Sequence, residues 1–179
     1  MNDPKKATQA RQRSRPLGAS WDQEGADVRV KKQRRYYSGK KKRYTQKNHL
    51  MVDLQSKKIL AVAIGKGREH DFRVCKRSGQ VKVLHAEIEL LGDSGFQGVL
   101  KLHGLSRTPF KRSKRKALTD EQKAFNRLLA SERVIAEHVI RRLKVFRVLK
   151  EVYRHRRRRF GLRVHLLAGL YNADLGKSE

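Results

Sequence analysis

The chain has 179 residues, and its 45 Lys and Arg against 17 Asp and Glu give a formal net charge of +28. Such an excess predicts a polyanionic partner, with DNA or RNA first and an anionic membrane second. The single cysteine, Cys75, excludes an internal disulfide and a thiolate zinc site. The longest apolar run, residues 59–64, is far too short to span a bilayer. We therefore expect one domain of ordinary size, in the cytoplasm and associated with the nucleoid.

Basic segments occur along the whole chain. Residues 1–18 offer almost nothing to bury, which predicts a disordered tail. Residues 31–43 (KKQRRYYSGKKKR) predict a basic loop or hairpin, and further basic segments lie at 111–116 and 154–159. Residues 17–30 lack the apolar pattern of a strand. The strand-like part of the sequence is therefore expected to begin after residue 43.

Short strands are predicted in the middle of the chain. Residues 45–54 and 59–64 are β-prone runs separated by a turn-like tetrapeptide, which favours two adjacent antiparallel strands. Residues 70–78 have apolar side chains at spacings that suit a short helix. A third strand through residues 88–91 is followed by a sharp stop at Asp93, which glycines flank.

The last third of the chain is predicted to be helical. Thr119, with Gln122 three residues later, is a capping-box pattern, so a long helix is expected to start near Asp120. One apolar stripe then recurs at spacings of three and four; its members are Phe125, Leu128, Leu129, Ala136, Val139, Ile140, Leu143 and Phe146. A further apolar helix is predicted over residues 160–175.

Two acids are candidates for a site. The residues that share one face of the long helix, at spacings of four, four and three, are Arg133, Glu137, Arg141 and Lys144. This pattern is typical of a salt-bridged solvated face, and it also suits a metal-binding carboxylate flanked by phosphate contacts. Asp93 is either a turn former in Asp-Ser-Gly or a site residue at the end of a buried strand. Asp93 and Glu137 converge if the long helix packs beside that strand.

Five blocks of sequence together carry a family resemblance. They are KKQRRYYSGKKKRYTQKNHLMVD, GKGREHDFRVCKRS, ELLGDSGFQG, RVIAEHVIRRLKVFRVL and YRHRRRRFGLRVHLLAGLYN. In this order they resemble the C-terminal catalytic domain of bacterial insertion-sequence transposases of the DDE superfamily, and more narrowly the insertion-sequence-five group. The resemblance covers residues 28–175.

The resemblance implies an α/β, RNase H-like fold, in which a mixed sheet is flanked by helices and a long C-terminal helix carries the last acid. Residues 28–179 would form this catalytic domain, after a basic segment at 1–27. The implied activity is metal-dependent phosphodiester cleavage and strand transfer at transposon ends. Three acids would bind two Mg²⁺ (or Mn²⁺) ions, which activate a water or a 3′-hydroxyl and stabilise the leaving oxygen. The implied partner is duplex DNA, both the terminal inverted repeats and the target.

The resemblance also assigns roles to individual residues. Asp93 stands at the family's second acid, and Glu137 stands at the third. Arg133 and Lys144 match the basic positions of the family's helix motif, in which three residues separate Arg from Glu and six separate Glu from Lys. Both carry over as DNA contacts. The other predicted DNA contacts are Arg141, Lys40, Lys41 and Lys42.

The chain departs from the family pattern at two positions. Ala130 stands where the family has a Tyr, and the first acid is out of place. Aligning Glu24 with the family's Glu puts Trp21 at the position of the first Asp, while Asp22 is one residue out of register. Asp22 is kept as a candidate catalytic residue. We expect most of the first strand to be missing from a truncated transposase, and weak or no strand transfer, because two acids hold two metals poorly.

A rival function from another class stays open on the sequence alone. It is a non-enzymatic basic nucleic-acid-binding protein, in which the cations contact phosphates and the acids are merely salt-bridged. The sequence also leaves open whether two copies form a homodimer in a synaptic complex.

Overall fold

The computed structural model describes residues 14–25, 33–112, 117–155 and 157–177. Its centre is a mixed sheet with β1 (Pro16–Glu24) in the middle. On one side β1 pairs antiparallel with β3 (Arg43–Asp53), which pairs antiparallel with β4 (Ile59–Lys66). On the other side β1 pairs in parallel with β5 (Leu90–Leu91), which pairs in parallel with β6 (Ser106–Arg107). A short strand, β2 (Tyr37–Ser38), pairs with the start of β3.

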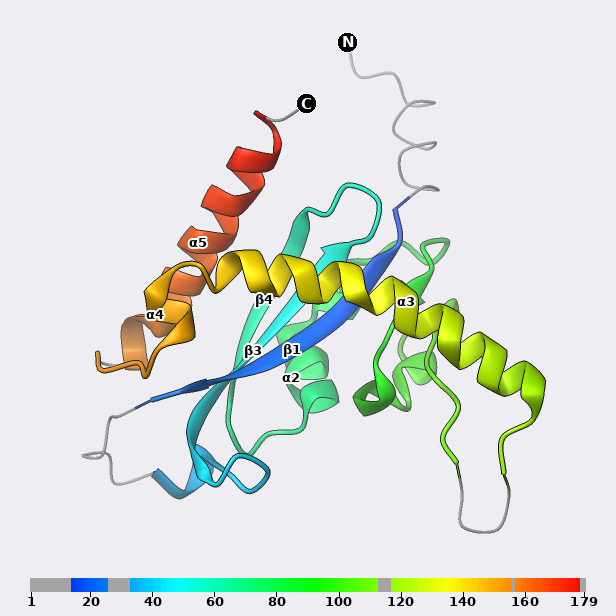
Figure 1. Cartoon of the computed structure of the whole chain (residues 1–179), viewed down its shortest axis with the longest axis horizontal. Helices are drawn as coiled ribbons and strands as arrows, with labels where there is room; N and C mark the ends of the chain where they lie inside the picture. Colours follow the sequence, from blue (N-terminus) through cyan, green and yellow to red (C-terminus); the bar gives the residue numbers. More distant parts are fainter. Residues whose placement is uncertain (1–13, 26–32, 113–116, 156, 178–179) are drawn as a thin grey trace.

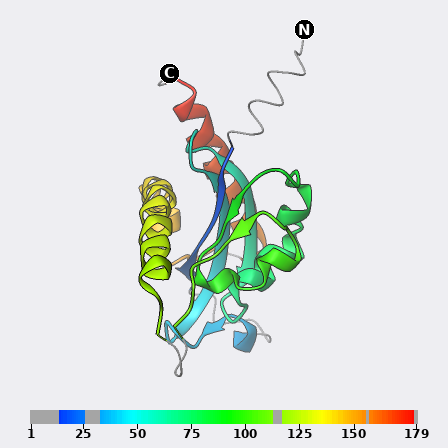
Figure 2. The ribbon, with the colours of Figure 1, turned by 90° about the vertical axis from the view of Figure 1, so that its right-hand side faces the viewer.

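Helices cover both faces of this sheet. They are α2 (Asp71–Ser78), α3 (Asp120–Leu143), α4 (Arg147–Lys150) and α5 (Phe160–Leu175). The 3₁₀ turns are η1 (Gln33–Arg35), η2 (Gln80–Val83), η3 (Ser94–Phe96), η4 (Val99–Lys101) and η5 (Arg157–Arg159). Figure 1 shows α3 crossing the sheet, and the turned view in Figure 2 shows α2 on the opposite side of the sheet from α3. Leu17 and Leu143 belong to the α3-side core, while Cys75 and Phe96 belong to the α2-side core.

The predicted antiparallel pair of strands is confirmed. β3 and β4 are joined at residues 54–58, and their pairing runs from Gln46 opposite Lys66 to Val52 opposite Ile59. The basic segment that precedes them forms a hairpin, in which Tyr37 pairs with Tyr44. The third predicted strand is confirmed as the two-residue β5, and the predicted short helix is α2.

The long helix starts as its capping box predicts. Thr119 Oγ1 accepts a hydrogen bond from the Gln122 N–H at 3.3 Å, and Gln122 Oε1 accepts one from the Thr119 N–H at 3.2 Å. The members of the apolar stripe that are buried within α3 are Leu129, Ala136, Val139, Ile140 and Leu143. Leu128 and Phe146 are exposed: the buried face of α3 is narrower than the predicted stripe, and the helix ends at Leu143, before Phe146.

The expectation for the first strand is wrong. β1 occupies residues that were predicted to be tail or non-strand, and all nine of its residues pair with β3. Gly18, Ala19 and Ser20 have low strand propensity, but long-range pairing with β3 overrides that preference. Gly18 packs closely, since a Cβ atom there would lie 3.1 Å from the His49 ring and would require a small shift of that ring. Residues 1–13 of the predicted tail and 113–116 of a predicted basic loop lie outside the described residues.

The fold is therefore α/β and RNase H-like, as the resemblance implies. Three antiparallel strands are extended by two short strands parallel to β1, and the long helix α3 carries Glu137. The proposed division of the chain at residue 27 stays a prediction, and β1 lies on the N-terminal side of that division. Among the described residues, no helix combines the length and the apolar character needed to cross a membrane.

Candidate functional site

Asp93 lies at the end of β5, beside the central strand. Leu91, the last residue of β5, pairs in parallel with Leu17, the second residue of β1, so β5 ends beside the first half of β1 and Asp93 follows beside the middle of that strand. The Asp93 side chain accepts a hydrogen bond from the Ser94 N–H and so caps the 3₁₀ turn η3. The turn-former interpretation is thus correct as local structure. The Asp93 carboxylate can still contact other groups, because the side chain is 34% exposed.

Arg133 brings the two candidate acids together. Its Nη1 lies 3.0 Å from Asp93 Oδ1, and its Nη2 lies 3.8 Å from Glu137 Oε1. Glu137 is one helical turn after Arg133 on α3, and its side chain is 64% exposed. The expected convergence of Asp93 and Glu137 is therefore present, with one guanidinium bound to both carboxylates.

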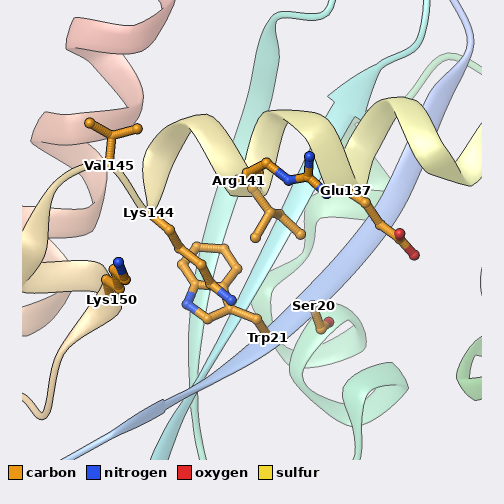
Figure 3. Close-up of a pocket in the computed structure, with 8 residues that line it drawn as sticks. Ser20, Trp21, Glu137, Arg141, Lys144, Val145 and Lys150 are labelled. Atoms are coloured by element: carbon orange, nitrogen blue, oxygen red, sulfur yellow. The ribbon is translucent and has the colours of Figure 1, made fainter.

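Trp21 lies on the face of β1 that α3 covers, and it lines a cavity together with Glu137. It is 8% exposed and belongs to the α3-side core. A cavity beside it is lined by Ser20, Trp21, Glu137, Ile140, Arg141, Lys144, Val145 and Lys150. Figure 3 shows the Trp21 ring beneath the Lys144 side chain, and Lys144 Nζ lies 6.0 Å from the ring centroid. At position 21, β1 therefore presents an indole and not a carboxylate to the cavity that Glu137 also lines.

Cations from three parts of the chain meet near Lys144. A second cavity is lined by Asp22, Gln23, Glu24, Lys40, Lys41, Arg43, Thr45, Lys144, Leu149 and Lys150. Partial burial lowers the pKa of Lys144, and the positive charge of Lys41 lowers it further. Like charges held this close favour an anion between them. Of the predicted DNA contacts, Lys40, Lys41 and Lys144 share this cavity, while Arg141 lines the first one and Lys42 is exposed in the turn.

Asp22 points to the other face of the sheet. Neighbouring residues of a strand face opposite sides, and Trp21 faces α3. The Asp22 carboxylate accepts a hydrogen bond from Ser38 Oγ at 3.4 Å and lies 3.7 Å from Lys47 Nζ. Lys47 also pairs with Asp71 of α2 at 2.6 Å. The structure thus groups Asp22 with Lys47 and Asp71 and not with the Asp93–Glu137 pair.

The residues present do not fit a two-metal site. In the part of the chain that the structure describes, no group of three or more His, Cys, Asp or Glu side chains could hold a metal ion. Asp93 and Glu137 supply only two carboxylates, and Arg133 already compensates their charge. Two Mg²⁺ ions with near-octahedral geometry require more oxygen ligands than this pair offers.

Comparison with known proteins identifies the family. The sequence model for the DDE superfamily endonuclease family matches residues 25–172, which is most of the chain. The chain belongs to this family. The chain is also 46% identical over 146 residues to a protein from Microchaete diplosiphon described as a probable transposase for insertion sequence element IS702. That alignment covers 81% of this chain and 52% of the relative, so the chain spans about half the length of the curated relative it matches. No solved structure matches.

The family match begins at residue 25, directly after β1. The strand that holds Trp21 thus lies outside the family match in sequence, but it still occupies the central position of the sheet. Sequence reasoning placed Trp21 at the position of the first acid, but it missed Lys150, which reaches both cavities from α4. Only the tertiary packing of α4 against β1 could have indicated Lys150.

Proposed function

We propose that this chain is the catalytic-domain part of a DDE transposase, which grips duplex DNA at transposon ends but cleaves it poorly on its own. In an intact site of this kind, two Mg²⁺ or Mn²⁺ ions support phosphodiester cleavage and strand transfer. Asp93 and Glu137 are the proposed catalytic and metal-binding acids. The observation that carries the proposal is Trp21, which projects into the cavity beside Glu137 from the strand position that the resemblance gives to the first acid.

The cations around the acid pair support the DNA-binding half of the proposal. Lys41, Lys144 and Lys150 line one cavity, and Arg141 lines the adjacent cavity. A phosphate bound among them would offset the like-charge repulsion and the desolvation that lower the pKa of Lys144. Duplex DNA carries one negative charge for about every 1.7 Å of its axis, so one phosphate in this cavity brings its neighbours with it. The net charge of +28 adds long-range attraction.

Trp21 supports the second half of the proposal, the low cleavage activity. Its buried indole offers no oxygen ligand, and its ring fills space that a carboxylate and a hydrated ion would need. Asp22 is a poor substitute, because its carboxylate faces Ser38 and Lys47 on the other side of the sheet. The family match disfavours the rival, a non-enzymatic basic protein outside this family.

The proposal is tested by returning an acid to position 21. We expect Trp21→Asp to bind Mn²⁺, measured by titration calorimetry, and we expect this binding to be lost again when Asp93→Asn is added. Trp21→Asn is the matched control, because it has the size of Asp and the same cost of removing the indole but no charge. Circular dichroism compares the folding of both variants with that of the wild type.

The wild-type chain gives a second readout that needs no substitution. Trp21 is its only tryptophan, so Mn²⁺ bound at this site would quench the intrinsic fluorescence. We expect no saturable quenching, while a duplex of about 30 base pairs binds in the absence of metal with steep salt dependence. Saturable quenching of the wild type, or efficient Mg²⁺-dependent nicking by it, would overturn the proposed deficiency; failure to bind duplex DNA would overturn the proposed partner.

A DNA partner implies that the chain acts in the cytoplasm at the nucleoid, which we propose on that ground alone. A homodimer in a synaptic complex stays a prediction, to be checked by sedimentation of the chain with and without duplex DNA.

A further inference from the structure

A third cavity, lined mainly by basic side chains, lies at the start of α5, apart from the acid pair. It is lined by His155, Arg158, Arg159, Leu162 and Arg163. Nothing in the catalytic resemblance assigns these side chains a role. Four of the five lining residues are basic, and they surround a hollow in the surface and do not merely line an exposed helix face.

Tyr153 holds the cavity in shape. Its ring is 3% exposed and packs edge-on against Phe160, with ring centroids 4.7 Å apart. The Arg163 guanidinium lies 5.5 Å from the centre of the Tyr153 ring and donates a hydrogen bond to Tyr153 Oη. The His155 ring packs against Tyr153 at 5.7 Å. The Tyr153 N–H donates to the Glu24 carbonyl, which ties this cluster to the end of β1. Two of the basic groups are thus positioned before any ligand arrives.

The charge of this cavity is not compensated within the described chain. Among the ion pairs of the described residues, none joins an acid to Arg158, Arg159 or Arg163, and the nearby Glu151 pairs instead with Arg147 at 2.7 Å. The positive end of the α5 dipole adds to the field, because Arg159 is the N-cap residue. Planar guanidinium groups match the oxygens of a phosphate in two-point hydrogen bonds. The cavity therefore suits an anion, and the net charge of +28 favours one that belongs to a polyanion such as DNA.

We propose that this cavity binds phosphate groups of the DNA backbone and so forms a second DNA contact, which rests on the proposed function of the acid-pair side. The connection between the two contacts is short. Lys150 at the end of α4 lines both cavities near Trp21, and the chain passes from there through Tyr153 into the basic turn η5. Figure 1 shows α4 between the end of α3 and the start of α5. One duplex lying over α4 reaches both groups of cations.

The test compares two pairs of substitutions that remove the same charge. Arg158→Gln with Arg159→Gln empties the proposed contact, and Lys76→Gln with Lys82→Gln removes two exposed cations from the α2 side. Affinity for a duplex of about 30 base pairs is measured by fluorescence anisotropy over a series of KCl concentrations. Each phosphate contact contributes about 0.9 to the slope of log affinity against log salt, so the first pair should lower the slope by about 1.8. The control pair should change it little.

A third variant separates the phosphate contact from local structure. Arg163→Lys keeps the charge beside Tyr153 but loses the two-point geometry, so we expect weaker duplex binding at a temperature at which circular dichroism shows the variant to be folded. Equal slopes for the Arg158/Arg159 pair and the wild type, or equal loss in both pairs, would refute the second contact while the proposed function stands. No duplex binding by the wild type would refute the proposed function and this inference together.

Discussion

Two pairs of carboxylates lie on opposite faces of the sheet, and one cation holds each pair. On the α3 side, Arg133 lies 3.0 Å from Asp93 and 3.8 Å from Glu137. On the α2 side, Lys47 lies 2.6 Å from Asp71 and 3.7 Å from Asp22. The two clusters have the same charges in nearly the same arrangement, and they differ in exposure.

Exposure decides which cluster can act on a partner. The side chains of Arg133 and Glu137 are 36% and 64% exposed, whereas those of Lys47 and Asp22 are only 14% and 12% exposed. The remaining acids, Asp93 and Asp71, are similar at 34% and 31%. An exposed ion pair adds about 0 to 1 kcal/mol to stability and can exchange its partner for an external ion. A nearly buried pair cannot exchange partners cheaply, because each charge left behind must be solvated. We infer that the α3-side cluster is available for DNA and that the α2-side cluster stabilises the fold.

The largest expected effect is on the α2-side cluster. Lys47→Met should lower the free energy of unfolding by about 3 kcal/mol, since it leaves the nearly buried Asp22 carboxylate, and with it the partly exposed Asp71, without their shared cation. Urea unfolding followed by the fluorescence of Trp21, the only tryptophan, measures the loss.

Two matched variants sharpen this comparison. Lys47→Arg keeps the charge and should retain most of the stability. Arg133→Gln, the equivalent change on the α3 side, should cost less than about 1 kcal/mol, because its ion pairs are exposed. Equal costs at Lys47 and Arg133 would show that exposure does not separate the two clusters.

A loss of stability at low pH, caused by His49 on the α2 side of the sheet, should be somewhat smaller than the effect of Lys47→Met. Burial lowers the pKa of His49 to about 4, against the attraction of the Asp71 charge, which would raise it. The unfolded chain has the ordinary His pKa of about 6.5, so between these values it binds more protons than the folded chain, and stability falls as the pH falls. The expected loss is about 2 kcal/mol between pH 7 and pH 5.

Chemical unfolding at several pH values measures this loss. His49→Gln should flatten the profile over the same range, whereas His165→Gln, at an exposed site on α5, should leave the profile unchanged. A wild-type profile that is flat from pH 7 to pH 5 would contradict the buried neutral state of His49.

The sequence predicts the elements that local signals specify. The capping box at Thr119 sets the start of α3, and the two β-prone runs set the β3–β4 hairpin. β1 could not be predicted from local signals, because Gly18, Ala19 and Ser20 have low strand propensity. These residues form a strand because they pair with β3. The missing signal is tertiary and not local.

The candidate site shows the same limit. Spacing alone puts Arg133 and Glu137 on one face of a helix, and the resemblance adds Asp93 as their partner. The face toward which Asp22 points could not be predicted without the strand register, because a shift of one residue moves a side chain to the opposite side of the sheet. Once β1 is paired, Trp21 and not Asp22 faces the cavity beside Glu137.

The smallest expected effect is a gain in DNA affinity. Asp93→Asn with Glu137→Gln removes one half-buried and one exposed anion from the surface proposed to meet phosphates, so duplex affinity in EDTA and low salt should rise roughly 3- to 10-fold. Asp120→Asn with Glu121→Gln makes the same charge change at the far end of α3 and should raise affinity much less. Fluorescence anisotropy on the same duplex measures both pairs. An equal gain in both pairs would mean that only net charge matters and that the acid pair lies away from the bound DNA. A clearly larger gain at Asp93 and Glu137 would place the phosphates beside Arg133, whose guanidinium is then free to bind them.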